Sequence, residues 1–286
     1  MPAEGDHPYE ILDVFTDTPL QGNPLAVFTA GEEVPSRLMQ AAARELHLSE
    51  TVFVLPGDDE ADAAVRIFTP DRELPFAGHP CLGAAFVVGE HHNLATVRLR
   101  TGAGIVPVRL TRDHGEIVFG EMDQPIPTVE PYSDPDELLD ALGVEAEPAL
   151  PLERYVNGPA HVIVALGDPE QVGALVPDMV ALAELGLMGV ACCAPIDVEL
   201  VKARYFCPAF GIAEDPATGS AAGPLALHLA RHGLIPFGRA VSIEQGAEIG
   251  RPSRLQARVE GDPDVTDGVV VGGSAVPVAR GRFRLQ

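Results

Sequence analysis

Residues 204–233 read RYFCPAFGIAEDPATGSAAGPLALHLARHG, and this stretch decides the fold of the chain. Alternation around Tyr205 predicts the end of a strand, and a turn-forming run follows over residues 211–218. Small residues and leucines at helical spacing then predict a helix, for which Gly233 is a typical C-terminal cap. This order leaves backbone N–H groups pointing at a ligand. No lysine of the nucleotide-binding type follows Gly219, so a nucleotide phosphate is not the ligand indicated.

The same order of features occurs once earlier in the chain. Arg66-Ile-Phe-Thr-Pro70 matches Arg204-Tyr-Phe-Cys-Pro208 as R-x-F-x-P, and a glycine turn and a run of small residues follow each copy. The first turn carries Gly78 and the second carries Gly219. Two copies so far apart favour a duplicated domain over a solenoid, whose repeats are far shorter. Chance similarity in a chain rich in glycine and alanine is the alternative.

Composition indicates a globular protein that is long enough for two domains. The chain has 286 residues, of which 46% are hydrophobic and 21% are charged. No apolar run approaches the length of a membrane span, and the first residues are acidic and polar, unlike a secretory signal. We therefore expect a cytoplasmic protein that does not enter a membrane.

The charge balance excludes two classes of partner. Lys and Arg number 19 against 42 Asp and Glu, which gives a net charge of −23. Such a chain is repelled by a nucleic acid duplex and by an anionic membrane. An anionic small substrate would need a local positive potential, and helix N-termini supply one without Lys or Arg.

The four cysteines form no metal or redox motif, because no two of them are spaced as CxxC. Cys192 and Cys193 lie in an apolar run, where we expect buried, inert thiols. A solvated turn explains the adjacent His91 and His92 better than a metal site does. We therefore predict neither a metal nor a cofactor.

Many strands and few helices, arranged twice, predict an α+β fold rather than a doubly wound sheet. A helix is expected over residues 35–46, with Glu45 in its last turn, and a shorter apolar helix over residues 81–88. Asp134 and Glu137 have the spacing of a capping box at the start of a further helix.

The best linker candidate is Asp123-Gln-Pro-Ile-Pro127. It divides the chain into an N-terminal domain over residues 1–122 and a C-terminal domain over residues 123–286. Whether the last strand, within residues 275–286, packs back onto the first domain stays open.

Polar residues gather at the two predicted glycine turns. If the two domains are related by pseudo-symmetry, Gly78-His79 and Gly219-Ser220 would face each other across a cleft. Two helix N-termini aimed at one point make an anion pocket, and domain interfaces often hold small-molecule sites. The alternative is that both glycines only serve tight turns.

Four side chains are candidates for such a pocket, and each has a simpler explanation. Glu45 is either a solvated charge or a general base whose pKa is raised by burial and by the helix dipole. Asp215 and Ser220 could cap the following helix, and His79 could be a buried, satisfied turn histidine.

Several long motifs follow one another along the chain: Asp13-Val-Phe-Thr16, Gly22-Asn-Pro-Leu-Ala-Val-Phe28, Glu45-Leu-His-Leu-Ser-Glu-Thr51, Arg66-Ile-Phe-Thr-Pro70, Glu73-Leu-Pro-Phe-Ala-Gly-His-Pro80, Glu214-Asp-Pro-Ala-Thr-Gly-Ser220, Glu244-Gln-Gly246 and Gly250-Arg-Pro-Ser253. Together they resemble the phenazine-biosynthesis PhzF family. The resemblance covers essentially the whole chain, and the shared order of the motifs makes it specific.

The resemblance implies a fold like that of diaminopimelate epimerase, in which two similar domains each wrap a mixed sheet or barrel around a central helix, with the site between them. It also implies a homodimer and cofactor-free isomerase chemistry on a small carboxylic acid. Glu45 matches the family's proton-transferring carboxylate and would move a proton within a conjugated substrate. The residues that match its substrate-binding groups are the side chains of His79, Asp215 and Ser220 and the backbone N–H groups at Gly78 and Gly219.

Two positions depart from the family pattern. Cys81 stands where threonine is common, and Cys207 stands where a small or apolar residue is usual. Related racemases use two cysteines, one at each helix start, whereas the second repeat here carries Ser220 and Ala221. Two alternatives remain: a racemase or epimerase that uses Cys81 with Glu45, and a protein that binds a small carboxylate without chemistry.

Overall fold

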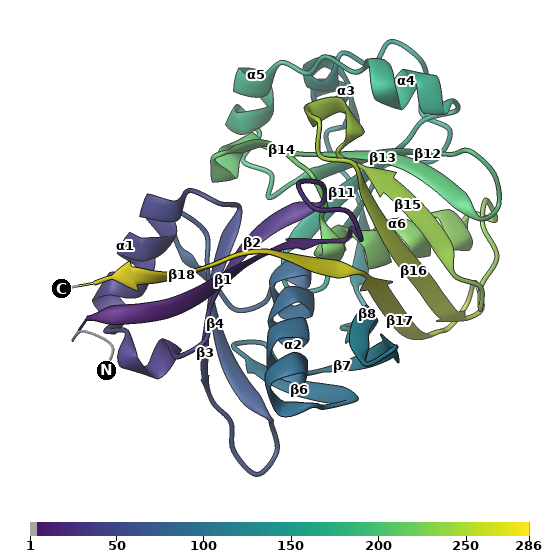
Figure 1. Cartoon of the computed structure of the whole chain (residues 1–286). Helices are drawn as coiled ribbons and strands as arrows, with labels where there is room; N and C mark the ends of the chain where they lie inside the picture. The colour runs from purple at the N-terminus through teal and green to yellow at the C-terminus, as the bar shows by residue number, and fades with distance from the viewer. Residues whose placement is uncertain (1–4, 286) are drawn as a thin grey trace. The chain divides into compact units, whose positions relative to one another are not determined.

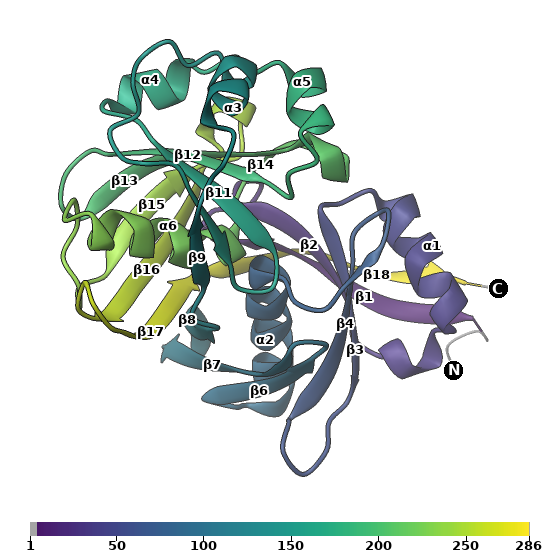
Figure 2. The same ribbon diagram turned by 180° about the vertical axis from the view of Figure 1, so that it is seen from behind.

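The computed structural model describes residues 5–285, which divide into two compact units (Figure 1). The first unit comprises the described residues up to Asp123 and those from Gly272 onward, and the second comprises Gln124–Val271. In each unit the strands curve around one buried helix, α2 in the first and α6 in the second (Figures 1 and 2). No helix in residues 5–285 is both long enough and apolar enough to cross a membrane.

The strands of the first unit pair in the order β18-β1-β2-β3-β4-β6-β7-β8, with β5 also pairing with β4. Two of these pairs, β2–β3 and β4–β6, are parallel and therefore need a crossover, which α1 and α2 provide. The bounds are β1 (Asp6–Val14), β2 (Asn23–Phe28), α1 (Ser36–Leu46), β3 (Glu50–Pro56), β4 (Ala63–Phe68), β5 (Glu73–Leu74), α2 (Gly78–His92), β6 (Thr96–Thr101), β7 (Gly104–Asp113), β8 (Glu116–Gln124) and β18 (Ala275–Arg284).

The second unit repeats this topology step by step. Its strands pair in the order β9-β10-β11-β12-β13-β15-β16, with β14 also on β13, and the parallel pairs are again the third and fifth, β11–β12 and β13–β15. The bounds are β9 (Thr128–Pro131), α3 (Pro135–Leu142), β10 (Glu153–Val156), β11 (Ala160–Ala165), α4 (Pro169–Ala174), α5 (Met179–Glu184), β12 (Val190–Pro195), β13 (Leu200–Cys207), β14 (Ile212–Asp215), α6 (Gly219–Arg231), β15 (Val241–Gln245), β16 (Ser253–Gly261) and β17 (Thr266–Gly273). The predicted duplication is thus confirmed.

The two central helices are buried over most of their length because their residues are small or apolar on every side. The buried residues of α2 run from Gly78 to Gly89, and those of α6 run from Gly219 to Ala230. A Cβ atom at Gly83 would lie 2.5 Å from Leu25 Cδ2, so a larger residue there would force the side chain of Leu25 on β2 to shift.

Three local expectations need correction. The helix expected over 81–88 is α2, which extends from Gly78 to His92, so His91 and His92 form its last turn rather than a solvated turn. His91 Nε2 lies 3.1 Å from Glu10 Oε1 on β1. Asp134 precedes α3, but its side chain makes no capping bond, because it accepts the hydroxyl of Ser133 instead.

The chain ends in strand β18, which lies along β1 (Figure 1). The pairing is antiparallel from Asp6 opposite Arg284 to Val14 opposite Ala275, with one irregularity after Ile11. The final strand is therefore part of the first unit's sheet.

Candidate active site

Glu45 lies in the last turn of α1 and is exposed to solvent. The helix buries Met39, Ala42 and Ala43, which places Glu45 on its other side. It ends at His47, whose backbone is left-handed with φ of 52°. Within residues 5–285 no hydrogen bond or ion pair joins Glu45 to another side chain. The expectation that this carboxylate would be buried is wrong, because Glu45 is exposed.

The start of α2 holds His79, which is only 3% exposed. Burial lowers the pKa of His79 to about 3, so its ring is neutral at physiological pH. Asn23 Nδ2 lies 3.3 Å from His79 Nδ1. With the amide in this orientation, Nδ1 accepts and the ring hydrogen is on Nε2. His79 Nε2 in turn lies 3.4 Å from Glu50 Oε2, without the angles of a hydrogen bond.

Cys81 follows two residues later in the same helix and has no exposed surface. Burial raises the pKa of its thiol to about 12, so the thiolate is not populated near neutrality. Cys192 and Cys193 are equally buried, as expected, and burial raises their pKa values too. Cys81 is therefore enclosed within the first unit with its thiol protonated.

The loop before α6 is held together by its own polar side chains. Asp215 ends β14, is 6% exposed, and accepts the Thr218 hydroxyl at 2.5 Å. Gln245 at the end of β15 donates to the Asp215 carbonyl oxygen at 2.7 Å and to Thr218 Oγ1 at 3.1 Å. Asp215 thus braces this loop rather than capping α6 with its side chain, since the cap residue is Thr218.

The first turn of α6 carries Gly219 and Ser220, both buried. The N–H groups of Ala221 and Ala222 donate to the carbonyl oxygen of Thr218 at 3.0 and 3.1 Å, which leaves those of Gly219 and Ser220 without a helical acceptor. The helix dipole gives this end a positive potential. The carbonyl oxygens of the same turn are bound by two amide side chains. Gln124 Nε2 donates to Gly219 O at 2.8 Å, and Asn157 Nδ2 donates to Ser220 O at 2.9 Å.

Each copy of the R-x-F-x-P motif makes the same interaction. Arg66 binds Glu73 through Nε and Nη2, both at 2.7 Å. Arg204 binds Glu214 through the same two atoms at 2.9 and 2.7 Å. The first pair is largely exposed, whereas the side chains of the second are 9% and 7% exposed. Glu214 is therefore a buried structural partner of Arg204.

The structure brings the predicted residues together in two groups, one in each unit. In the first unit His79 lies beside Glu50 at the start of β3, four residues after α1 ends, while Glu45 itself stays exposed. In the second unit Asp215, Gly219 and Ser220 occupy one loop and the helix start that follows it. The sequence prediction missed Asn23, Glu50, Asn157 and the glutamines that support these positions. The dipeptides Asn23-Pro24 and Asn157-Gly158 were signals, but they are equally typical of plain turns.

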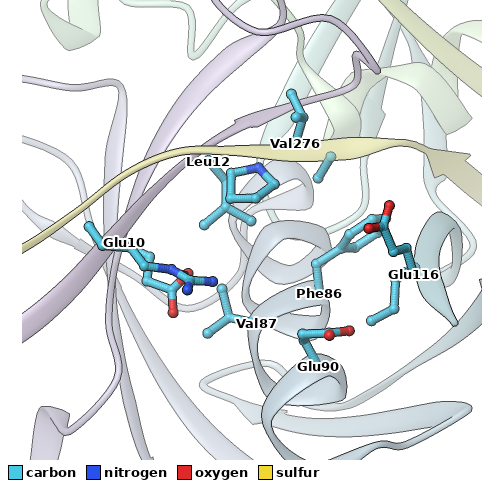
Figure 3. Close-up of a pocket in the computed structure, with 11 residues that line it drawn as sticks. Glu10, Leu12, Phe86, Val87, Glu90, Glu116 and Val276 are labelled. Atoms are coloured by element: carbon cyan, nitrogen blue, oxygen red, sulfur yellow. The ribbon is translucent and has the colours of Figure 1, made fainter.

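A cavity of about 370 Å³ lies elsewhere in the first unit (Figure 3). Its walls come from β1, the C-terminal half of α2, the start of β8 and β18. Its apolar lining includes Leu12, Phe86 and Val87. The acidic residues Glu10 and Glu116 also line it. None of the predicted site residues lines this cavity.

The chain was compared with known proteins. A trans-2,3-dihydro-3-hydroxyanthranilate isomerase of Pseudomonas aeruginosa is 48% identical over 279 residues, which cover 98% of this chain and 100% of that protein. A solved structure described as a predicted epimerase, also from P. aeruginosa, is 33% identical with a TM-score of 0.84 and covers 98% of this chain and 100% of its own.

A more distant solved structure shows the fold alone. It is a hydroxyproline epimerase from Agrobacterium vitis, 12% identical, with a TM-score of 0.70 over 100% of this chain and 94% of that one. The two-domain epimerase-like fold is thereby confirmed. The family model described as phenazine biosynthesis-like protein, PhzC-PhzF, matches residues 12–281. The chain therefore belongs to the phenazine biosynthesis-like PhzC-PhzF family.

Proposed function

We propose that this PhzF-type isomerase moves a proton within a small carboxylic acid, without a cofactor, and that Glu45 is its general acid and base. The observation that carries the proposal is the match, along nearly the whole chain, to proteins named as isomerases. The choice of Glu45 rests on its place in the sequence motif Glu45-Leu-His-Leu-Ser-Glu-Thr51. An aligned general base typically contributes 10²- to 10⁴-fold in rate.

In this proposal the substrate carboxylate binds the N–H groups at Gly78 and Gly219 and the hydroxyl of Ser220. A helix N-terminus is equivalent to about half a positive charge, which suits an anion in a chain of net charge −23. The same donors would stabilise the charge that develops when the proton leaves. His79, neutral and with its hydrogen on Nε2, would donate a hydrogen bond, and Asp215 would accept one.

Glu45 must come within hydrogen-bond reach of the substrate to act. An exposed carboxylate at the end of a short helix has the freedom to turn toward a bound ligand. Catalytic contacts of this kind often form only in the complex. We therefore propose that Glu45 meets the substrate on binding, next to the segment that leads to Glu50 and His79.

The substrate that we propose to test first is trans-2,3-dihydro-3-hydroxyanthranilate, the compound in the name of the 48% identical relative. It combines a carboxylate for the helix N-termini with ring amino and hydroxyl groups for His79 and Asp215. We further propose that the enzyme is a homodimer, which sedimentation equilibrium would measure.

The decisive experiment replaces Glu45 with glutamine, which keeps the shape and removes the basicity. We expect kcat on that substrate to fall by about 10²-fold or more, with KM changed little. The matched control is Glu33→Gln, because Glu33 is an equally exposed acid just before the same helix. Turnover that survives in the Glu45 variant would refute the assignment.

Two further measurements separate the alternatives. A protein that only binds carboxylates would gain thermal stability from the compound but turn over none of it. A racemase based on Cys81 would exchange the α-proton of an amino acid in D₂O and lose this exchange in Cys81→Ser. The raised pKa of the Cys81 thiol, about 12, counts against it.

A further inference from the structure

Helix α6 contains a proline in its interior, Pro224. In an α-helix the N–H of residue 224 would donate to the carbonyl oxygen of residue 220. Proline has no N–H, so the Ser220 carbonyl loses its helical donor. Both residues are buried, so the carbonyl oxygen is largely shielded from bulk water. A buried carbonyl without a partner is unfavourable, and another donor is needed.

Asn157 supplies that donor. It follows β10, is only 4% exposed, and its Nδ2 lies 2.9 Å from Ser220 O. This contact joins segments 63 residues apart in the sequence. The Asn157 amide therefore gives the Ser220 carbonyl oxygen a donor in place of the missing N–H of Pro224.

Gln124 reinforces the same turn from a second direction. Its Nε2 donates to Gly219 O at 2.8 Å, and its Oε1 lies 3.5 Å from Asn157 Nδ2. The close approach depends on Gly223, where a Cβ atom would lie 2.6 Å from Gln124 Oε1 and 2.5 Å from Val269 Cγ1. Two neighbouring amides thus bind two successive carbonyl oxygens of the α6 start.

We propose that Asn157 is a positioning residue, which replaces the N–H that Pro224 removes and so holds the turn whose N–H groups and Ser220 hydroxyl bind the substrate. The proposal rests on the proposed function for the role of Ser220 and Gly219. The structural part of the proposal does not depend on the proposed function. It says only that Asn157 fixes the first turn of α6 in place of a helical hydrogen bond.

The test is a cycle of four proteins: wild type, Asn157→Leu, Pro224→Ala and the double variant. Leucine keeps the size of asparagine and removes the donor, and alanine at 224 restores the helical N–H to Ser220 O. We expect KM for trans-2,3-dihydro-3-hydroxyanthranilate to rise about tenfold in Asn157→Leu, the equivalent of one hydrogen bond, with kcat changed far less. Pro224→Ala alone should resemble wild type, and the double variant should regain the wild-type KM.

Hydrogen–deuterium exchange over residues 216–226 gives a readout that needs no substrate. We expect faster exchange there in Asn157→Leu and wild-type protection in the double variant. If Asn157→Leu does not fold, the double variant decides the question, because it lacks the amide but has the helical bond. Unchanged exchange in the single variant, or no recovery in the double variant, would overturn the proposal. If the double variant recovers wild-type exchange but Asn157→Leu leaves KM unchanged, Ser220 does not bind the substrate. That result would not bear on the role of Glu45, which the Glu45→Gln experiment tests.

Discussion

The protonation state of His79 is set by the residues that surround it in the first unit. Its residue type and its place after a glycine turn identified it as a candidate. Its protonation state follows from burial and from Asn23, neither of which a motif reveals. Asn23 precedes a proline, and such a dipeptide predicts a turn with no hint of a buried histidine far along the chain.

The ring of His79 should stay neutral across the working range of pH. Because burial lowers its pKa to about 3, we expect ¹⁵N NMR of the imidazole to report a neutral ring, with hydrogen on Nε2, from pH 8 down to pH 5. Asn23→Leu should release the ring to populate both tautomers. A ring that titrates near 6.5, as a free imidazole does, would contradict this prediction.

At the scale of elements, the repeated motif predicted the duplicated fold but not the unequal burial of its two copies. Arg66 and Arg204 make the same paired contact with a glutamate, yet only the Arg204 pair is buried. Arg204 Nη1 also donates to the carbonyl oxygen of Leu175, the residue that follows α4, at 2.7 Å. In the second unit the parallel strands β11 and β12 are connected by two α-helices, α4 and α5, whereas α1 is the α-helix that connects β2 and β3 in the first unit. Local sequence does not reveal which of two similar ion pairs later elements will cover.

This difference predicts unequal costs for the same substitution. Glu214→Gln leaves the Arg204 charge buried without its partner, and we expect the free energy of unfolding to fall by about 3–5 kcal/mol. The matched change Glu73→Gln removes an exposed pair and should cost at most about 1 kcal/mol. Urea denaturation of the two variants measures both values, and equal losses would show that burial of the pair is not what matters.

At the scale of the whole molecule, buried neutral histidines should make the protein sensitive to acid. Burial lowers the pKa values of His79 and His161 to about 3 and that of His228 to about 4. The unfolded chain protonates these rings near pH 6.5, whereas the folded chain does not. The unfolded state thus binds more protons, so stability is full above pH 6.5 and is lost as the pH falls toward 4.

Each such histidine should contribute a slope of about 1.4 kcal/mol per pH unit within that window. Urea titrations at pH 7, 6 and 5 would measure the total, and His161→Gln should reduce the slope by about one histidine's share. His161 suits this test because it is not a candidate site residue. Its Nδ1 lies 2.7 Å from the hydroxyl of Tyr205. An unchanged slope in the variant would show that His161 is protonated in the folded protein.

The return of β18 to the edge of β1 has a consequence for synthesis on the ribosome. Residues 6–14 are made long before the strand that pairs with them, which runs from Ala275 to Arg284. The intervening unit, Gln124–Val271, emerges whole before that closing strand exists. Until β18 is made, strand β1 therefore has one unpaired edge, and a chaperone bound there would prevent its pairing with other chains.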